Sequence, residues 1–582
     1  MPRINRETKI WMPSFAMDAF LSFNVFLVLF VFRRLDFDGG HEGYLLTTAI
    51  AQADGFQIYK DYFSLYGSVL PWIQSLVVSI SGFQSAINLR ILDSLLVAVV
   101  FFLILNLRRF IGLQKHGLSQ VFLMSGVTWL CLAYFFNGMS QHPWSSTIAL
   151  AIQLLIVNML LWLLDLPVGN SSIYIPIFGI GVLLALIPFT RLNVGIATMA
   201  STYFILISFS RFFPTYRFSA LPIFVINTIG MMIFFAYFLL SNSISDLIEQ
   251  SILIPRRVFT SSWMVGPENW NAIPVLSRYF WISLPPIILV IFCVLALNKK
   301  GIDIDSKLEK KLIIGLPITL GMVLAFCLRV SQMEFWLYQR LIVFIMVFGV
   351  ILAIVLIARH VFEAFLKSRN SNQKTDLSLI IIAFFGLSGI VQVYPTHDPR
   401  HIWWGLPLLI VLAPLALSQS RFLPKTYQGT MIYKLFVLTL ASAVFVAGAQ
   451  KTLSVDRLII EFDAPFKGME VKANTYKKLK SEFMFLKQNL DSQSKVFFQC
   501  GVEETHWLAS FDGNYHSKSP WFVDLSFYPG HPKPKYLVEI GDQMIICGDR
   551  VRQGEIAAEF DFTIIAKSEY LAIAELKNLA KK

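Results

Sequence analysis

The chain has 582 residues, of which 55% are hydrophobic and only 15% are charged, and its mean hydropathy is +0.61. This balance excludes a soluble globular protein and indicates a polytopic membrane protein. The formal net charge is +12, but the Lys and Arg residues lie in short loops between apolar runs, which indicates membrane topology and no nucleic-acid partner.

Apolar runs of about 17 to 23 residues, each long enough to cross a membrane as a helix, recur along most of the chain. We expect a polytopic α-helical membrane protein with about thirteen transmembrane helices. The expected spans are residues 13–32, 88–107, 119–137, 145–164, 173–190, 192–210, 218–240, 279–297, 312–328, 341–358, 377–393, 406–418 and 435–450.

The basic opening segment places the N-terminus in the cytoplasm by the positive-inside rule. No small-residue cleavage site follows the first apolar run, so we expect it to be retained as a helix of a multi-pass cell-membrane protein. We expect a transmembrane domain at 1–450, with a first extracytoplasmic loop at 35–87. The odd number of spans then leaves 451–582 outside the cytoplasm.

Residues 451–582 have mixed charge and short strand-like segments, such as SKVFFQCGVEE, KYLVEIG and GDQMIICGD. These patterns predict a small extracytoplasmic α/β domain. Cys500 and Cys547 lie in it, and the sequence fits a disulfide and two unpaired thiols equally well.

The segment from Asp36 to Pro71 is a long polar interruption in an otherwise apolar N-terminal third. Helical spacing at 44–53 and 67–81 predicts two interfacial amphipathic helices along the membrane. Acidic groups near a membrane are costly unless they face water or a partner, so chemistry is expected in this segment.

The candidate catalytic residues are Asp38, His41 and Glu42. A carboxylate can accept the proton of an attacking hydroxyl, although Asp38 also suits a helix cap and His41 suits a hydrogen bond to a backbone carbonyl. Their ligand types suit a divalent cation, but the spacing matches no strong metal motif, so no metal ligand and no certain cofactor are predicted.

Four outer segments concentrate polar residues, and Arg191 lies between two closely spaced spans. Arginine forks bind phosphate oxygens, so these residues suit a lipid-linked phosphate substrate; membrane anchoring, salt bridging or a tight hairpin would explain each one equally simply. The candidate substrate-binding residues are Asp61, Arg90, Arg191, Arg256, Arg257, Arg278, Arg340, Arg400 and His401.

One motif resembles a known family. Asp38 is followed by HEGY, then by AQADGFQIYKDY, YGSVLP and the arginine-led NLRILD, and DPRHIWWGLPLLIVL follows late in the chain. This order resembles the GT-C superfamily of membrane glycosyltransferases, in particular its aminoarabinose transferase and protein O-mannosyltransferase branches. Many relatives have an adjacent acidic pair where this chain has His41 and Glu42, so either Asp38 or Glu42 would fill the catalytic position.

The resemblance implies transfer of a sugar from a polyprenyl-phosphate-linked donor to a glycan, lipid or protein acceptor on the extracytoplasmic side. An acidic residue of the first loop would act as the base, arginines would hold the carrier phosphate, and a single in-line displacement would invert the sugar. Three other functions fit the sequence: a transporter or flippase, a polysaccharide polymerase or ligase, and a scaffold that binds membrane lipids and partners.

Overall fold

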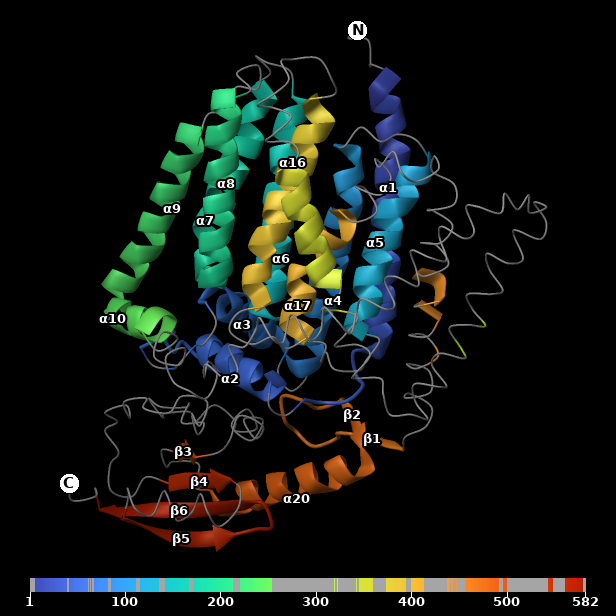
Figure 1. Ribbon diagram of the computed structural model, residues 1–582. Helices are drawn as coiled ribbons and strands as arrows, with labels where there is room; N and C mark the ends of the chain where they lie inside the picture. Colours follow the sequence, from blue (N-terminus) through green and yellow to red (C-terminus); the bar gives the residue numbers. More distant parts are fainter. Residues whose placement is uncertain are drawn as a thin grey trace.

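The computed structural model shows a helical bundle with a mixed sheet at one end (Figure 1). Apart from a few single positions, the structure describes residues 6–38, 41–60, 67–81, 85–110, 116–134, 142–166, 171–212, 220–253, 345–358, 373–393, 399–412, 456–490, 496–499, 543–547 and 561–578.

Six of the described helices are long and apolar enough to cross a membrane. They are candidate membrane spans near six of the predicted positions. The total of thirteen stays a prediction, because residues 279–297 and most of 312–328 lie outside the described part. The six are α1 (Arg6–Phe32), α4 (Ser85–Asn106), α6 (Ser145–Asp165), α7 (Tyr174–Thr190), α8 (Leu192–Phe212) and α9 (Ala220–Leu240).

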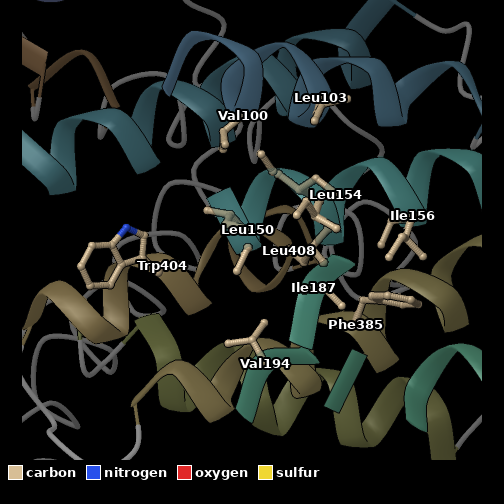
Figure 2. Packing of buried hydrophobic residues seen from close by; sticks show 14 of the residues in the cluster. Val100, Leu103, Leu150, Leu154, Ile156, Ile187, Val194, Phe385, Trp404 and Leu408 are labelled. Carbon is tan, nitrogen blue, oxygen red and sulfur yellow. The ribbon is translucent and has the colours of Figure 1, made fainter. Parts of the chain in front are cut away.

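Helix α6 is central to the bundle, because it is apolar on all sides and contacts α4, α7, α8 and α16 (Gln373–Gly389). Figure 2 shows Leu150, Leu154 and Ile156 of α6 among apolar side chains of these neighbours. By contrast, α1 and α9 expose rows of large apolar side chains, as expected of helices that face lipid.

Two short helices, α2 (His41–Ala53) and α3 (Val69–Ser81), follow α1 and lie across one end of the bundle (Figure 1). We call this the loop end. The helices agree closely with the predicted ones at 44–53 and 67–81. Helix α3 exposes Leu76 and Ile80, as an interfacial helix would, but α2 is covered by protein: Leu45 packs against the bundle and Leu46 packs against the C-terminal segment.

The C-terminal segment contains a hairpin of β1 (Arg457–Ile459) and β2 (Glu470–Lys472), the helix α20 (Ala473–Asn489) and a four-stranded sheet. The sheet has the order β3-β4-β6-β5, in which β3 and β4 are parallel and the other pairs are antiparallel. Its strands are β3 (Val496–Gln499), β4 (Gln543–Cys547), β5 (Asp561–Lys567) and β6 (Leu571–Asn578). The predicted strands in SKVFFQ and GDQMIIC are therefore present, whereas Cys500 lies outside the described residues.

A second apolar cluster joins the C-terminal segment to the loop end. Leu46 of α2, Val78 of α3 and Ile87 of α4 share it with Phe466 and Phe483. The chain begins at the opposite end of the bundle (Figure 1). The predicted first outer loop and the C-terminal segment therefore lie at the same end of the molecule.

Candidate functional site

The loop end contains a buried ion pair between two of the predicted site residues. Arg90 Nε donates to Glu42 Oε1 at 2.5 Å and Arg90 Nη2 donates to Glu42 Oε2 at 2.6 Å. The side chains are only 2% and 3% exposed. Such a two-pronged pair fixes the relative position of α2 and α4 and replaces the water that each charge loses on burial.

The other N–H groups of Arg90 hold the segment between α1 and α2. Nη1 donates to the carbonyl oxygens of Arg33 at 3.1 Å and Leu35 at 2.7 Å, and Nη2 donates to the carbonyl oxygen of Asp36. All five N–H donors of the guanidinium therefore have acceptors within the chain. In this arrangement Arg90 holds the loop and has no donor left for a substrate phosphate.

Asp38 is positioned by Glu42. Its backbone N–H donates to Glu42 Oε2 at 2.8 Å, and its carbonyl oxygen accepts from the Glu42 N–H at 3.0 Å. Asp38 is partly exposed, and its charge lies close enough to Glu42 to influence that carboxyl. Burial raises the pKa of Glu42, whereas the guanidinium of Arg90 and the Asp38 N–H act in the opposite direction.

The three predicted catalytic residues thus differ in their surroundings. Both oxygens of Glu42 accept N–H groups, so Glu42 is not available as a base or metal ligand unless the ion pair opens. The backbone of His41 begins α2, but its side chain lies outside the described residues. Within the described part of the chain, no three His, Cys, Asp or Glu side chains are grouped to hold a metal ion.

The second half of the loop is held by the segment after α9. Gln250 donates from Nε2 to the carbonyl oxygen of Tyr59 at 2.7 Å and accepts from the Ser64 N–H at 3.0 Å. Tyr59 has a left-handed backbone with φ of 69°, and burial raises its pKa to about 12. Its neighbour Asp61, a predicted substrate-binding residue, lies outside the described residues.

Arg191 ends α7 at the loop end of the bundle and forms the hairpin to α8. Its guanidinium donates to Ser146 Oγ in the first turn of α6. The preceding Thr190 accepts from the Gly67 N–H at 3.2 Å, which joins the hairpin to the start of α3. The predicted hairpin is therefore present, and Arg191 lies at the same end of the molecule as Asp38.

The late motif DPRHIWWGLP forms α17 (Pro399–Gly405), whose tryptophans are packing residues. Trp403 stacks on Trp129 with ring centroids 4.4 Å apart, and the two exchange indole-to-carbonyl hydrogen bonds. Trp404 donates to Thr147 Oγ1 at 3.1 Å. His401 is edge-on to Trp404 at 5.4 Å, while the side chain of Arg400 lies outside the described residues.

Four predicted phosphate-binding residues lie wholly outside the described part of the chain, namely Arg256, Arg257, Arg278 and Arg340. Conversely, sequence reasoning missed Arg457 and Glu470, which contact Asp36 from the far end of the chain. No local pattern marks them, because an arginine and a glutamate beside short strands are ordinary in any soluble segment.

A comparison with protein-family models finds no match, and a comparison with curated proteins finds none either. Among solved structures, ArnT from Cupriavidus metallidurans bound to undecaprenyl phosphate matches with 11% identity and a TM-score of 0.41, covering 96% of this chain and 97% of that one. Its apo state matches with a TM-score of 0.42, covering 98% of both chains at 11% identity.

The archaeal oligosaccharyltransferase AglB from Archaeoglobus fulgidus, in complex with an inhibitory peptide and a dolichol-phosphate, matches with 10% identity and a TM-score of 0.41. The match covers 89% of this chain but only 65% of AglB. Because these TM-scores lie below 0.5, the functional proposal rests on the residues of this chain.

Proposed function

We propose that the chain is a membrane glycosyltransferase that moves a sugar from a polyprenyl-phosphate-linked donor to an envelope glycan, lipid or protein acceptor on the extracytoplasmic face. The observation that supports this proposal is the rigid acidic loop at one end of the bundle. There the buried Glu42–Arg90 pair holds the backbone of a partly exposed Asp38. A preorganised carboxylate beside a membrane suits proton removal from an acceptor hydroxyl.

In the proposed reaction Asp38 accepts the proton of the acceptor hydroxyl, whose oxygen attacks the anomeric carbon of the sugar. The bond from that carbon to the carrier phosphate breaks, and negative charge develops on the phosphate. A single in-line displacement of this kind inverts the anomeric centre. Glu42 and Arg90 do not touch the reacting atoms and act by positioning Asp38.

The leaving phosphate needs cationic donors on the same side of the membrane. Arg191 is a described candidate, since it lies at the loop end of the bundle, where its guanidinium donates to Ser146 Oγ. Arg256, Arg257, Arg278, Arg340, Arg400 and His401 complete the proposed set on the basis of the sequence. A divalent cation, if used, would bind on the Asp38 side, because the Glu42 carboxylate is buried in its pair with Arg90.

The positions of the buried charges favour this proposal over a transporter. In the six described spans, the charged side chains lie in the outer parts and not at the middle: Asp18 pairs with Arg109 at the end opposite the loop, and Arg90 pairs with Glu42 at the loop end, with Asp93 one turn further along α4. Transporters place ionisable groups near mid-membrane, where they handle ions or substrate.

The test replaces Asp38 with Asn in the full-length protein and supplies, as donor, the pool of polyprenyl-phosphate-linked sugars extracted from source membranes. We expect D38N to fold normally and to lower sugar transfer by about 10²- to 10⁴-fold, the usual contribution of a general base. The matched control is D463N, which removes an exposed carboxylate paired with Lys467.

Full transfer activity in a folded D38N protein would show that the base is assigned wrongly. Mass spectrometry of lipid-linked saccharides that accumulate in a deletion strain identifies the sugar. If no such lipid accumulates and the wild-type protein transfers nothing from the pool, the transferase proposal fails. A parallel assay with a chelator decides whether a divalent cation takes part.

A further inference from the structure

The segment that leads to Asp38 is held on two sides. On the bundle side, Arg90 donates to the carbonyl oxygens of Leu35 and Asp36. On the other side lies the β1–β2 hairpin, residues 457–472, which we call the docking hairpin. It belongs to the C-terminal segment and is separated from the loop by more than four hundred positions, for example 421 between Arg457 and Asp36.

Backbone hydrogen bonds join the loop to strand β2. The Asp36 N–H donates to the Glu470 carbonyl oxygen at 2.8 Å, and the Glu470 N–H donates to the Arg34 carbonyl oxygen at 2.7 Å. Leu35 and Glu470 thereby form a parallel bridge. The segment before Asp38 is thus joined to β2 by an isolated β-bridge.

The side chains of Asp36 and Phe37, the two residues before Asp38, also contact the docking hairpin. Arg457 approaches Asp36 with Nε 3.4 Å from Oδ1 and Nη2 3.5 Å from Oδ2. The ring of Phe37 packs on Phe466 with centroids 4.9 Å apart. The guanidinium side chain is only 6% exposed, so water screens this pair less than it screens a surface pair.

The backbone at Asp36 shows why such support is needed. Its φ is 54°, in the left-handed region that a residue with a side chain adopts only at a cost. A strained turn of this kind persists when the surrounding contacts overdetermine it. Here those contacts come from Arg90, Glu470 and Arg457 together.

The docking hairpin also holds the helix that carries Arg90. The carbonyl oxygen of Pro465 accepts from the Ala86 N–H at 2.9 Å in the first turn of α4, where no partner exists within the helix. Gly468, with φ of 86°, makes the turn before β2 and lies against Ile87 of the same helix. The hairpin therefore contacts both elements that fix Asp38.

We infer that the docking hairpin is a positioning element of the catalytic loop, with Arg457 and Phe466 as its positioning residues. This inference rests on the proposed role of Asp38. The C-terminal segment then acts on the reaction from outside the site, by fixing where the Asp38 carboxylate is presented. Loss of either contact leaves the bundle folded but lets the turn at Asp36 move.

Hydrogen exchange of the full-length protein in detergent tests the inference without any substrate. The readout is the exchange rate of peptides covering residues 33–44, divided by the rate of peptides from α6. We expect R457Q and F466A to raise this ratio about tenfold, because each removes a contact that protects the Asp36 and Asp38 amides. The matched control is K467Q, which breaks the exposed Lys467–Asp463 pair in the same hairpin and should leave the ratio unchanged.

A wild-type ratio in both R457Q and F466A would overturn the inference. An equal acceleration of the α6 peptides, which leaves the ratio unchanged, would also overturn it, since the hairpin would then support only general stability. R457K retains a cation beside Asp36 and should restore part of the protection.

An activity assay separates positioning from binding. With the extracted donor pool, R457Q and F466A should lower kcat about tenfold or more while KM for the donor and the pH profile of kcat stay as in the wild type. A change confined to KM would contradict positioning. If the wild type transfers no sugar, the proposed function fails, and the exchange ratio still decides whether the hairpin holds the loop.

Discussion

The guanidinium of Arg90 makes five hydrogen bonds at the loop end. Two go to the carboxylate oxygens of Glu42, and three go to backbone carbonyl oxygens of the loop after α1. Removal of one charge leaves the other buried without its partner. The resulting loss of stability is larger than the net contribution of the intact pair.

We therefore expect R90Q to lower the free energy of unfolding by about 3 to 5 kcal/mol. E42Q should cost less, about 1.5 to 3 kcal/mol, because the amide oxygen can still accept one N–H of Arg90. Thermal unfolding in detergent measures both. The control K467Q removes one partner of an exposed ion pair and should change the free energy of unfolding by less than about 1 kcal/mol. An R90Q protein as stable as K467Q would show that the Glu42–Arg90 pair does not stabilise the fold.

A second buried carboxyl gives a prediction about pH. Glu482 of α20 is fully buried and accepts a hydrogen bond from Ser568 Oγ, and burial raises its pKa. The folded chain therefore keeps a proton that the unfolded chain has already released. Stability contributed by this group is present below about pH 4.3, the ordinary value for Glu, and is lost as pH rises through the raised pKa.

E482Q should remove this component, so the variant gains stability over the wild type as pH rises towards neutrality. The amide oxygen of Gln can still accept from the Ser568 hydroxyl. The measurement is the apparent Tm of both proteins across pH 4 to 8 in one detergent. Parallel curves for wild type and E482Q would show that Glu482 does not titrate in this range.

At the scale of elements, the sequence predicted the last residues of α2 and α3 and placed their first residues within three positions, because apolar spacing and Gly55 determine local helix. It predicted less about what covers them. The periodicity of 44–53 marks an apolar face, but both Leu45 and Leu46 are buried, on different sides of α2. A pattern along one segment cannot show that a distant segment packs on the second side.

Gly67 illustrates a contact between elements that tolerates no side chain. A Cβ at this position would lie 1.8 Å from the Phe189 carbonyl oxygen at the end of α7. We expect G67A to separate the start of α3 from the α7–α8 hairpin and to destabilise the protein by at least about 2 kcal/mol. The change in apparent Tm measures this effect.

The matched control for G67A is G179A. The Cβ added there would meet only the flexible end of Met159, at 2.7 Å from Sδ, which can move aside. We expect a much smaller loss of stability in this variant. Equal losses in the two variants would argue against the tight backbone approach at Gly67.

At the scale of the whole molecule, α1 runs from the N-terminus to the loop end, where the C-terminal segment also lies (Figure 1). We expect the N-terminus in the cytoplasm and the C-terminal segment outside it. A phosphatase fused after Lys582 should be active, and a fluorescent protein fused before Met1 should fluoresce. The reverse pattern would place the loop that carries Asp38 in the cytoplasm.

The sequence placed Asp38, Glu42 and Arg90 in the candidate site because charges beside apolar spans are rare. It could not predict that Arg90 pairs with Glu42, since 48 positions separate them and a loop of undefined path lies between. It predicted strands after residue 451 for the same reason that it predicted helices, namely local periodicity. The docking hairpin contacts Asp36 and Phe37 through tertiary packing, which no local pattern in the sequence shows.

The docking hairpin has a consequence for biosynthesis. Arg457, Phe466 and Glu470 leave the ribosome hundreds of residues after the turn that they support. A nascent chain therefore forms its first helices early but completes these contacts with Asp36 and Phe37 only after residue 472 has been translated. Fragments released before that stage would carry the acidic turn without these contacts, so the proposed chemistry would begin only after synthesis has passed the docking hairpin.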